Sequence, residues 1–185
     1  MNSDSLQDII LRVQEFLNNH NTVSIASKNN ESVWAATVFY ISDTDMNLYF
    51  LSSDKTQHIG NIQTDENVAI TVYKDVEDWQ SIQGLQGTGQ IYEVRSSHRD
   101  KILADYIKKY VFLDELLQNP KDEQEKKIAE QFTNIGLYIY KPNFFRIIDN
   151  SISFGFKQEL VMKDDSWTIR SVSYTHLTLP TTPYV

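Results

Sequence analysis

Short β-strand patterns separated by polar turns constrain the fold of this chain more than any other feature. Segments rich in β-branched and aromatic residues alternate with turns rich in Asp, Asn and Ser, which favour turns through local hydrogen bonds. A hairpin turn is expected at residues 42–45 and a helical segment at residues 56–63. We expect the strands themselves at residues 22–27, 33–41, 47–52, 68–73 and 79–94.

Helical periodicity precedes this series of strands and later interrupts it. Residues 6–17 carry apolar side chains at helical spacing, and one of residues 3–5 can cap the first turn. Residues 96–132 are also helical in pattern, with a second helix expected after Asn119-Pro120. Strand patterns return at 135–140, 144–148, 152–156 and 158–162. This order predicts a mainly β (α+β) fold, in which helices pack outside an antiparallel barrel.

The length of 185 residues and the hydrophobic content of 41% suit a single domain, which we place at residues 1–170 with a helical insertion at 96–132. Residues 171–185 lack Asp, Glu, Lys and Arg and continue no earlier pattern. They are interpreted as a non-native tail, with a native disordered tail as the alternative.

Composition excludes several classes of function. The net charge of −8 argues against nucleic-acid binding, which needs a dense basic face. The local basic pairs Arg99/Lys101 and Lys108/Lys109 are interpreted as parts of a solvated helix face. No apolar run reaches the roughly 20 residues that span a bilayer, and the first residues do not form a signal peptide. The chain has no cysteine, so we expect no disulfide and a cytoplasmic protein.

Three glycines, Gly84, Gly87 and Gly89, fall within the fifth expected strand. Their order is not that of a dinucleotide-binding motif, and no helix start follows them. Glycines inside a strand mark a bend of the sheet or a surface that a flat ligand approaches closely. The sequence alone leaves both interpretations open.

Residues 52–58, Ser-Ser-Asp-Lys-Thr-Gln-His, leave a strand and enter a helix. Amide groups at a helix N-terminus attract anions, and Ser, Thr and Lys add donors, so a phosphate group can bind there. The alternative is a capped helix with Ser53 or Asp54 as the cap. The histidines are not paired at metal-ligand spacing, so we expect no metal site. No Ser/His/Asp arrangement identifies a catalytic centre.

Several blocks of the chain resemble a known family when they are taken in order. They are 34–40 (WAATVFY), 48–52 (LYFLS), 56–58 (TQH) with 66–69 (ENVA), 82–89 (IQGLQGTG), and 144–150 with 154–157. Together they resemble the pyridoxamine 5′-phosphate oxidase-like, FMN-binding split-barrel superfamily, and within it the uncharacterised YhbP-like family. The resemblance covers about residues 6–167.

This resemblance implies an antiparallel split β-barrel that forms a homodimer with FMN at the subunit interface. It places the strand of residues 34–39 beside the flavin ring, residues 52–58 at the phosphate, and the glycine-rich strand at the border of the pocket, with the ring against Gly84 and Gly87. The cofactor-binding residues that it implies are Trp34, Ala35, Ala36, Thr37, Leu51, Ser52, Lys55, Thr56, Gln57, His58, Gln83 and Gly84.

Gln57 departs from the oxidase pattern, which usually has Arg or Lys at this position. Glutamine is neutral and lacks the charged fork that Arg offers a phosphate, so FMN binding is expected to be weakened, with Lys55 and His58 compensating in part. The expected function is that of an FMN-dependent oxidoreductase of unknown substrate and electron donor. The alternatives are a non-catalytic flavin- or haem-binding, stress-related protein, or a dimeric module with an empty pocket.

Overall fold

The computed structural model describes residues 4–170, except residues 96 and 134. The prediction for the tail at 171–185 therefore lies outside the described residues. The helices are α1 (Leu6–Asn18), α2 (Gln57–Thr64), α3 (Arg99–Lys109), α4 (Val111–Gln118) and α5 (Glu123–Thr133). The strands are β1 (Thr22–Lys28), β2 (Val33–Phe39), β3 (Ile41–Ser42), β4 (Leu48–Ser52), β5 (Asn67–Tyr73), β6 (Gln83–Glu93), β7 (Gly136–Asp149), β8 (Lys157–Lys163) and β9 (Ser166–Ile169).

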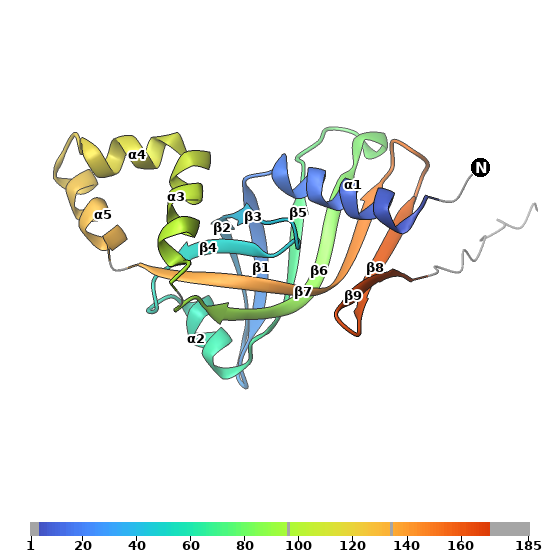
Figure 1. Ribbon diagram of the computed structural model, residues 1–185, viewed down its shortest axis with the longest axis horizontal. Coiled ribbons are helices and arrows are strands. Elements are labelled where there is room, and N and C mark those ends of the chain that lie inside the picture. The colour runs from blue at the N-terminus through green and yellow to red at the C-terminus, as the bar shows by residue number, and fades with distance from the viewer. Residues whose placement is uncertain (1–3, 96, 134, 171–185) are drawn as a thin grey trace, which may run out of the picture.

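The described strands form one curled, antiparallel sheet (Figure 1). Its order is β2-β1-β5-β6-β7-β4-β3, and β8 and β9 extend from β7. β2 contacts β4 although the two strands are not hydrogen-bonded neighbours, so the sheet curls into a barrel that is split along this line. The predicted antiparallel split barrel with an N-terminal helix and a helical insertion is confirmed.

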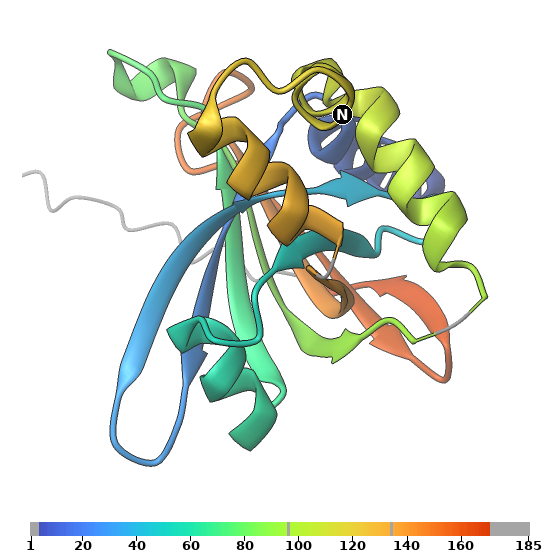
Figure 2. The same ribbon diagram turned by 90° about the vertical axis from the view of Figure 1, so that its left-hand side faces the viewer.

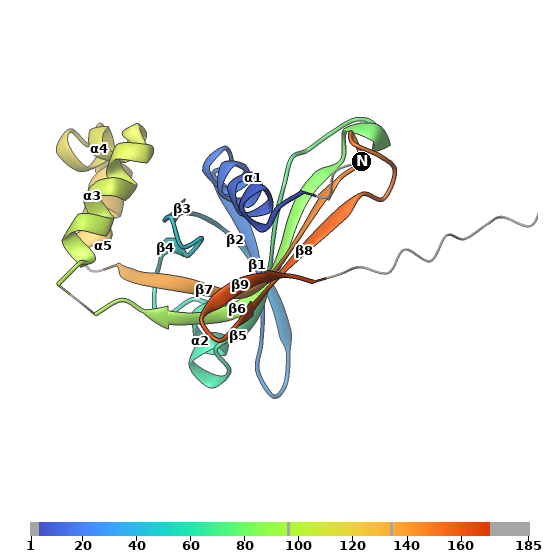
Figure 3. The same ribbon diagram turned by 45° about the vertical axis from the view of Figure 1, so that its right-hand side comes forward.

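A hydrophobic core fills the barrel, because alternate residues of each strand point to the same face of a sheet. Phe50, Leu85 and Phe145 are fully enclosed in it. Helix α1 packs over one end of the barrel through Ile9, Val13 and Leu17, and Ser5 caps it as one of the expected alternatives. Helices α3, α4 and α5 project to one side of the barrel (Figures 1 and 3).

The structure corrects three predictions about the elements. The strand patterns at 135–140 and 144–148 belong to one strand, β7, which runs through Pro142. Proline lacks an amide hydrogen, and the strand tolerates it because the pairing with β6 shifts by one residue between Thr88 and Gly89. The insertion contains three helices rather than two. The last strand pair lies at 157–163 and 166–169, whereas residues 151–155 form turns.

Candidate functional site

The end of β4 and the start of α2 gather three polar side chains. The Ser52 hydroxyl lies 2.9 Å from Nε2 of His58 and 3.2 Å from the Thr56 hydroxyl. The Thr56 hydroxyl lies 3.4 Å from the same Nε2 and donates to the Ser53 carbonyl at 2.9 Å. We call Ser52, Thr56 and His58 the hydroxyl–imidazole cluster. Its members are close because the turn after β4 reverses the chain directly into α2 (Figure 2).

His58 belongs to the buried side of α2, together with Ile59 and Ile62. Burial disfavours the charged imidazolium, so it lowers the pKa of His58 below its ordinary value. The neutral ring can accept a hydrogen bond from the Ser52 hydroxyl or donate one to it. At neutral pH the cluster therefore presents hydrogen-bonding groups without a histidine charge.

The N-terminus of α2 keeps its backbone donors available. Thr56 occupies the N-cap position, and its side chain makes no capping hydrogen bond to the helix. This differs from the predicted cap by Ser53 or Asp54. Because the first amides of a helix have no partner within the helix, an uncapped N-terminus favours an anion in this position. Lys55 is exposed on the same turn and supplies a positive charge.

Gln57 points its amide into a different network. Its Nε2 donates to Oδ1 of Asn61 at 2.9 Å, and Nδ2 of Asn29 donates to the same oxygen at 2.9 Å. Asn61 is fully buried and donates in turn to the Ser27 hydroxyl at 3.4 Å. Asn61 thus links α2 to the β1–β2 hairpin, and Gln57 helps to fix the orientation of the Asn61 side chain. The sequence analysis missed Asn61, although the i, i+4 spacing of Gln57 and Asn61 on one helix is a signal that could have found it.

Strand β2 divides its predicted site residues between two faces. Trp34 and Ala36 lie opposite Ser27 and Ile25 of β1, both buried, so they face the side on which α2 packs. Trp34 remains 49% exposed there, because β2 is the last strand of the sheet. Ala35 and Thr37 point the opposite way, toward what we call the outer face of the sheet.

The outer face carries small side chains from β1, β2, β5 and β6. They are exposed or half-buried, and they line a groove of about 460 Å³. Its lining includes Ser24, Ala26, Ala35, Ala69, Thr71 and Thr88. Val33, Phe39 and Tyr73 on the same strands are 77%, 45% and 61% exposed. The barrel therefore presents a broad, mostly apolar sheet face to its surroundings.

The remaining predicted residues lie apart from the hydroxyl–imidazole cluster. Leu51 alternates with the buried Phe50 and Ser52 on β4, so its side chain points to the other face of that strand. Gln83 and Gly84 lie at the start of β6, which pairs with the end of β5, whereas α2 leads into the beginning of β5. Gln83 donates to Asp149 of β7 at 3.1 Å. The structure thus separates Gln83 and Gly84 from residues 52–58.

The proposed reason for Gly87 is wrong. A Cβ atom on Gly87 would lie 2.8 Å from the Tyr140 hydroxyl and 3.0 Å from the Phe145 ring, both of which belong to the barrel core. Gly87 is therefore required by inward-facing aromatic side chains rather than by a ring on the outer face. A Cβ on Gly84 would make only ordinary contacts, the nearest at 3.6 Å.

In the described residues, no group of three or more His, Cys, Asp or Glu side chains is arranged so that it could hold a metal ion. Asp43 lies in the expected hairpin turn of residues 42–45, and both it and Asp78 accept hydrogen bonds from backbone amides that follow them. In the same part of the chain, no helix has the length and apolar character needed to cross a bilayer.

Comparisons with known proteins support the fold. The chain is 24% identical to a UPF0306 protein of Pasteurella multocida over 142 residues, which cover 76% of this chain and 84% of the relative. A pyridoxamine 5′-phosphate oxidase-related, FMN-binding protein of Nostoc punctiforme superposes with a TM-score of 0.61 at 14% identity, covering 90% of this chain and 94% of that one. No family model matches the chain.

A haem storage protein of Vibrio cholerae, HutZ, superposes with a TM-score of 0.54 at 14% identity, covering 71% of this chain and 88% of that one. At these identities the structural similarity establishes the fold alone. The predicted resemblance is confirmed for both the sequence family and the fold. In sequence the chain resembles the UPF0306 proteins, and its fold is that of the pyridoxamine 5′-phosphate oxidase-like split barrels.

Proposed function

We propose that this chain is an FMN-binding flavoprotein whose phosphate site is the turn of residues 52–58. The observation that carries the proposal is the uncapped N-terminus of α2 beside the hydroxyl–imidazole cluster. Backbone amides, the exposed Lys55 and the Ser52 hydroxyl form a donor set that suits a phosphate monoester, and the Thr56 hydroxyl joins it by exchanging its hydrogen bond to the Ser53 carbonyl for one to the phosphate. The residues present therefore fit the anionic end of FMN without a charge from Gln57.

The ring system of the flavin would lie beside β2. Trp34 and Ala36 face the side of β2 on which α2 packs, and the half-exposed indole of Trp34 offers a flat surface there. Bound FMN supplies hydride or electron transfer, and the protein binds and orients it. An oxidoreductase with a small-molecule substrate and electron donor is the corresponding class of function. The similarity to an FMN-binding protein agrees with this proposal.

A second copy of the chain is proposed to cover the outer face. This face exposes apolar side chains over several strands, including Val33, Phe39 and Tyr73. Large apolar patches on a protein surface commonly mark sites of association. A homodimer of this kind would reach the flavin ring only around the open edge of β2, because Trp34 and Ala36 face the other side of that strand. We further propose a cytoplasmic location, in keeping with the absence of cysteine.

A haem-binding role is the weaker alternative, although one structural neighbour is a haem storage protein. Haem iron is commonly held by His, Cys, Met or Tyr. Among the described residues that line the groove of the outer face, none has such a side chain.

A dimeric module with an empty pocket is the other alternative. One observation favours it, because the Gln57 amide donates to Asn61 rather than toward a ligand.

The test is a titration of the purified protein with FMN, followed by flavin fluorescence and sedimentation. We expect saturable binding in the micromolar range, a dimer, and reduction of the bound flavin by NADH or NADPH. Binding without reduction by any donor would indicate a non-catalytic carrier.

Gln57→Arg should tighten FMN binding about tenfold, because an added charge-assisted hydrogen bond contributes about 1.5–3 kcal/mol before the lost Asn61 contact is subtracted. An unchanged affinity would place the phosphate elsewhere.

A further inference from the structure

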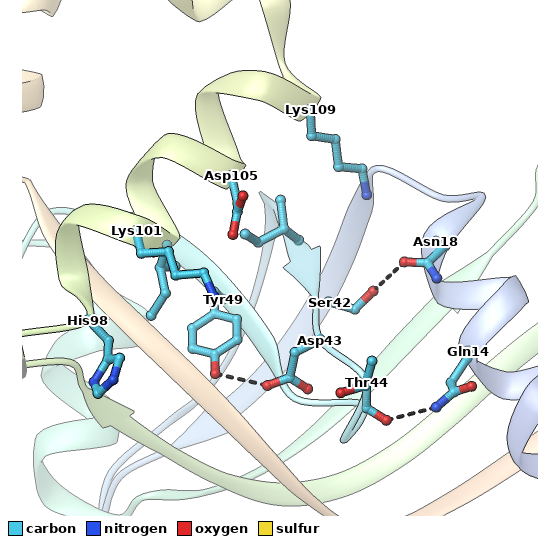
Figure 4. A pocket seen from close by; sticks show the side chains of 12 residues that line it. Gln14, Asn18, Ser42, Asp43, Thr44, Tyr49, His98, Lys101, Asp105 and Lys109 are labelled. Atoms are coloured by element: carbon cyan, nitrogen blue, oxygen red, sulfur yellow. Dashed lines mark hydrogen bonds between the residues drawn. The ribbon is translucent and has the colours of Figure 1, made fainter.

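A second cavity, of about 740 Å³, lies between the barrel and the helical insertion (Figure 4). Helix α1, the β3–β4 turn, β4 and α3 form its walls. This volume lies within the range of small-molecule sites in proteins. None of the residues that line this cavity belongs to the proposed flavin site, although β4 contributes Tyr49 to the cavity and Ser52 to the phosphate site.

Hydrogen bonds hold the walls of this cavity together. The Ser42 hydroxyl donates to Oδ1 of Asn18 at 2.9 Å, and Nε2 of Gln14 donates to the Thr44 carbonyl at 2.7 Å. On the opposite side, Nζ of Lys109 donates to the carbonyl oxygens of His20 at 2.9 Å and Tyr40 at 3.2 Å. These bonds fix the relative positions of the walls, and walls fixed by the fold are typical of small-molecule sites.

The acidic group on the floor of the cavity is already satisfied. Oδ1 of Asp43 accepts hydrogen bonds from the backbone amides of Asp45 and Asn47, both at 2.9 Å. Oδ2 accepts from the Asn47 amide group and from the Tyr49 hydroxyl, both at 2.9 Å. Asp43 therefore has little capacity left for a ligand and instead fixes the orientation of Tyr49.

Two charged side chains on α3 remain without partners in the part of the chain that the structure describes. Lys101 and Asp105 lie one helical turn apart at the exposed rim of the cavity that they line, and their side chains form neither a hydrogen bond nor an ion pair with each other or with another described residue. Opposite charges at i, i+4 on a helix commonly pair. Figure 4 shows Lys101 extending toward Tyr49 and the Asp105 carboxylate directed into the space between α3 and the barrel.

We propose that this cavity binds a small zwitterion that carries an ammonium group and a carboxylate on an aliphatic chain. Lys101 would pair with the carboxylate and Asp105 with the ammonium group. The four-residue spacing places the two helix positions about 6 Å apart along the axis, close to the charge separation of a short amino acid chain. Tyr49 and Ile102 also line the cavity and would contact the methylene groups.

The direct test compares three probes that share one carbon chain: δ-aminovalerate, valerate and n-pentylamine. Two-dimensional NMR of the full chain, with and without saturating FMN, should show δ-aminovalerate shifting the amides of α3 and the β3–β4 turn, with a millimolar dissociation constant. The two single-charge probes should each bind about threefold to fivefold more weakly, because a partly exposed ion pair contributes modestly. Equal binding of the three probes, or no binding of δ-aminovalerate, would overturn the proposal.

Variants on α3 separate this site from non-specific binding. Lys101→Gln and Asp105→Asn should each lower the affinity for δ-aminovalerate about threefold to fivefold. The matched control is Lys108→Gln, which removes a charge from an exposed position of the same helix that does not line the cavity. The exchange Lys101→Asp with Asp105→Lys should restore binding, since a zwitterion can reverse its orientation. An unchanged affinity in both single variants would contradict the proposal, provided that thermal unfolding shows them folded.

Discussion

The barrel and the helical insertion are stabilised in different ways. The barrel encloses a continuous hydrophobic core in which Phe50, Leu85 and Phe145 are fully buried. In the insertion, α4 has no buried residue and exposes Val111 and Phe112. Stability in small domains comes mainly from buried apolar area, so the two regions should differ in resistance to unfolding.

Hydrogen bonds of α3 and of Tyr110, which follows it, attach the insertion to the barrel together with the contact between the Phe39 and Tyr110 rings. The Tyr106 hydroxyl donates to the Phe39 carbonyl at 3.1 Å, and the Tyr110 hydroxyl contacts the carbonyl oxygens of Asn21 and Tyr40. Lys109 adds the two bonds described above and lies 4.9 Å from the centre of the Tyr40 ring. The proposed phosphate site therefore adjoins a well-packed core, whereas the cavity against α3 has one wall in a region with less buried apolar area.

The largest effect is expected from emptying the barrel core. Phe50→Ala should lower the free energy of unfolding by about 3–5 kcal/mol, because it leaves a cavity in a fully enclosed position. The matched change in the insertion, Phe112→Ala, should cost about 0.5 kcal/mol, since that side chain is 52% exposed. Urea unfolding of both variants checks this difference. Similar losses in the free energy of unfolding would contradict the claim that the two regions are stabilised differently.

A smaller difference is expected between two glycines of β6. Gly87→Ala should destabilise the barrel by about 1–3 kcal/mol, because the new methyl group would collide with Tyr140 and Phe145. Gly84→Ala should instead be neutral or stabilise the fold by about 0.5 kcal/mol, since the site has room and the unfolded chain loses freedom. The thermal unfolding midpoints of the two variants measure this difference. Equal effects would mean that the core does not determine the position of Gly87.

Tyr110→Phe should weaken the attachment of the insertion by about 1 kcal/mol, because it removes a buried hydroxyl that contacts two carbonyl oxygens. Hydrogen exchange should accelerate at the amides of α3 and α4 and stay unchanged in β6 and β7. Uniform acceleration throughout the chain would show that the insertion and the barrel unfold as one unit.

The smallest effect is expected in the pH dependence of stability, through His58 of α2. The lowered pKa of His58 means that the unfolded chain binds a proton at this residue before the folded chain does. The contribution of neutral His58 to the free energy of unfolding is therefore complete above the ordinary pKa of about 6.5. It is lost as the pH falls from there toward the pKa of His58 in the folded chain. His58→Gln should flatten the decline of stability below that pH. An identical pH profile in the wild type and the variant would contradict the burial argument.

Much of the barrel was predictable because alternating strand patterns and polar turns are local signals. The continuity of β7 could not be predicted. The strand passes through Pro142 because its register against β6 shifts there, and that register is a long-range property. The grouping of Ser52, Thr56 and His58 followed from their closeness in sequence. The division of Trp34 and Ala36 from Ala35 and Thr37 needed the register with β1. Gly87 was misinterpreted because its neighbours Tyr140 and Phe145 are distant in sequence.

The most direct measurement compares the dissociation constants of FMN and riboflavin, which share the ring system and differ by the phosphate. If residues 52–58 hold the phosphate, FMN should bind at least about tenfold more tightly. Thr56→Val should remove most of this advantage by deleting a hydroxyl of the cluster, while riboflavin binding stays constant. Equal affinities for FMN and riboflavin in the wild-type protein would contradict the proposed phosphate site.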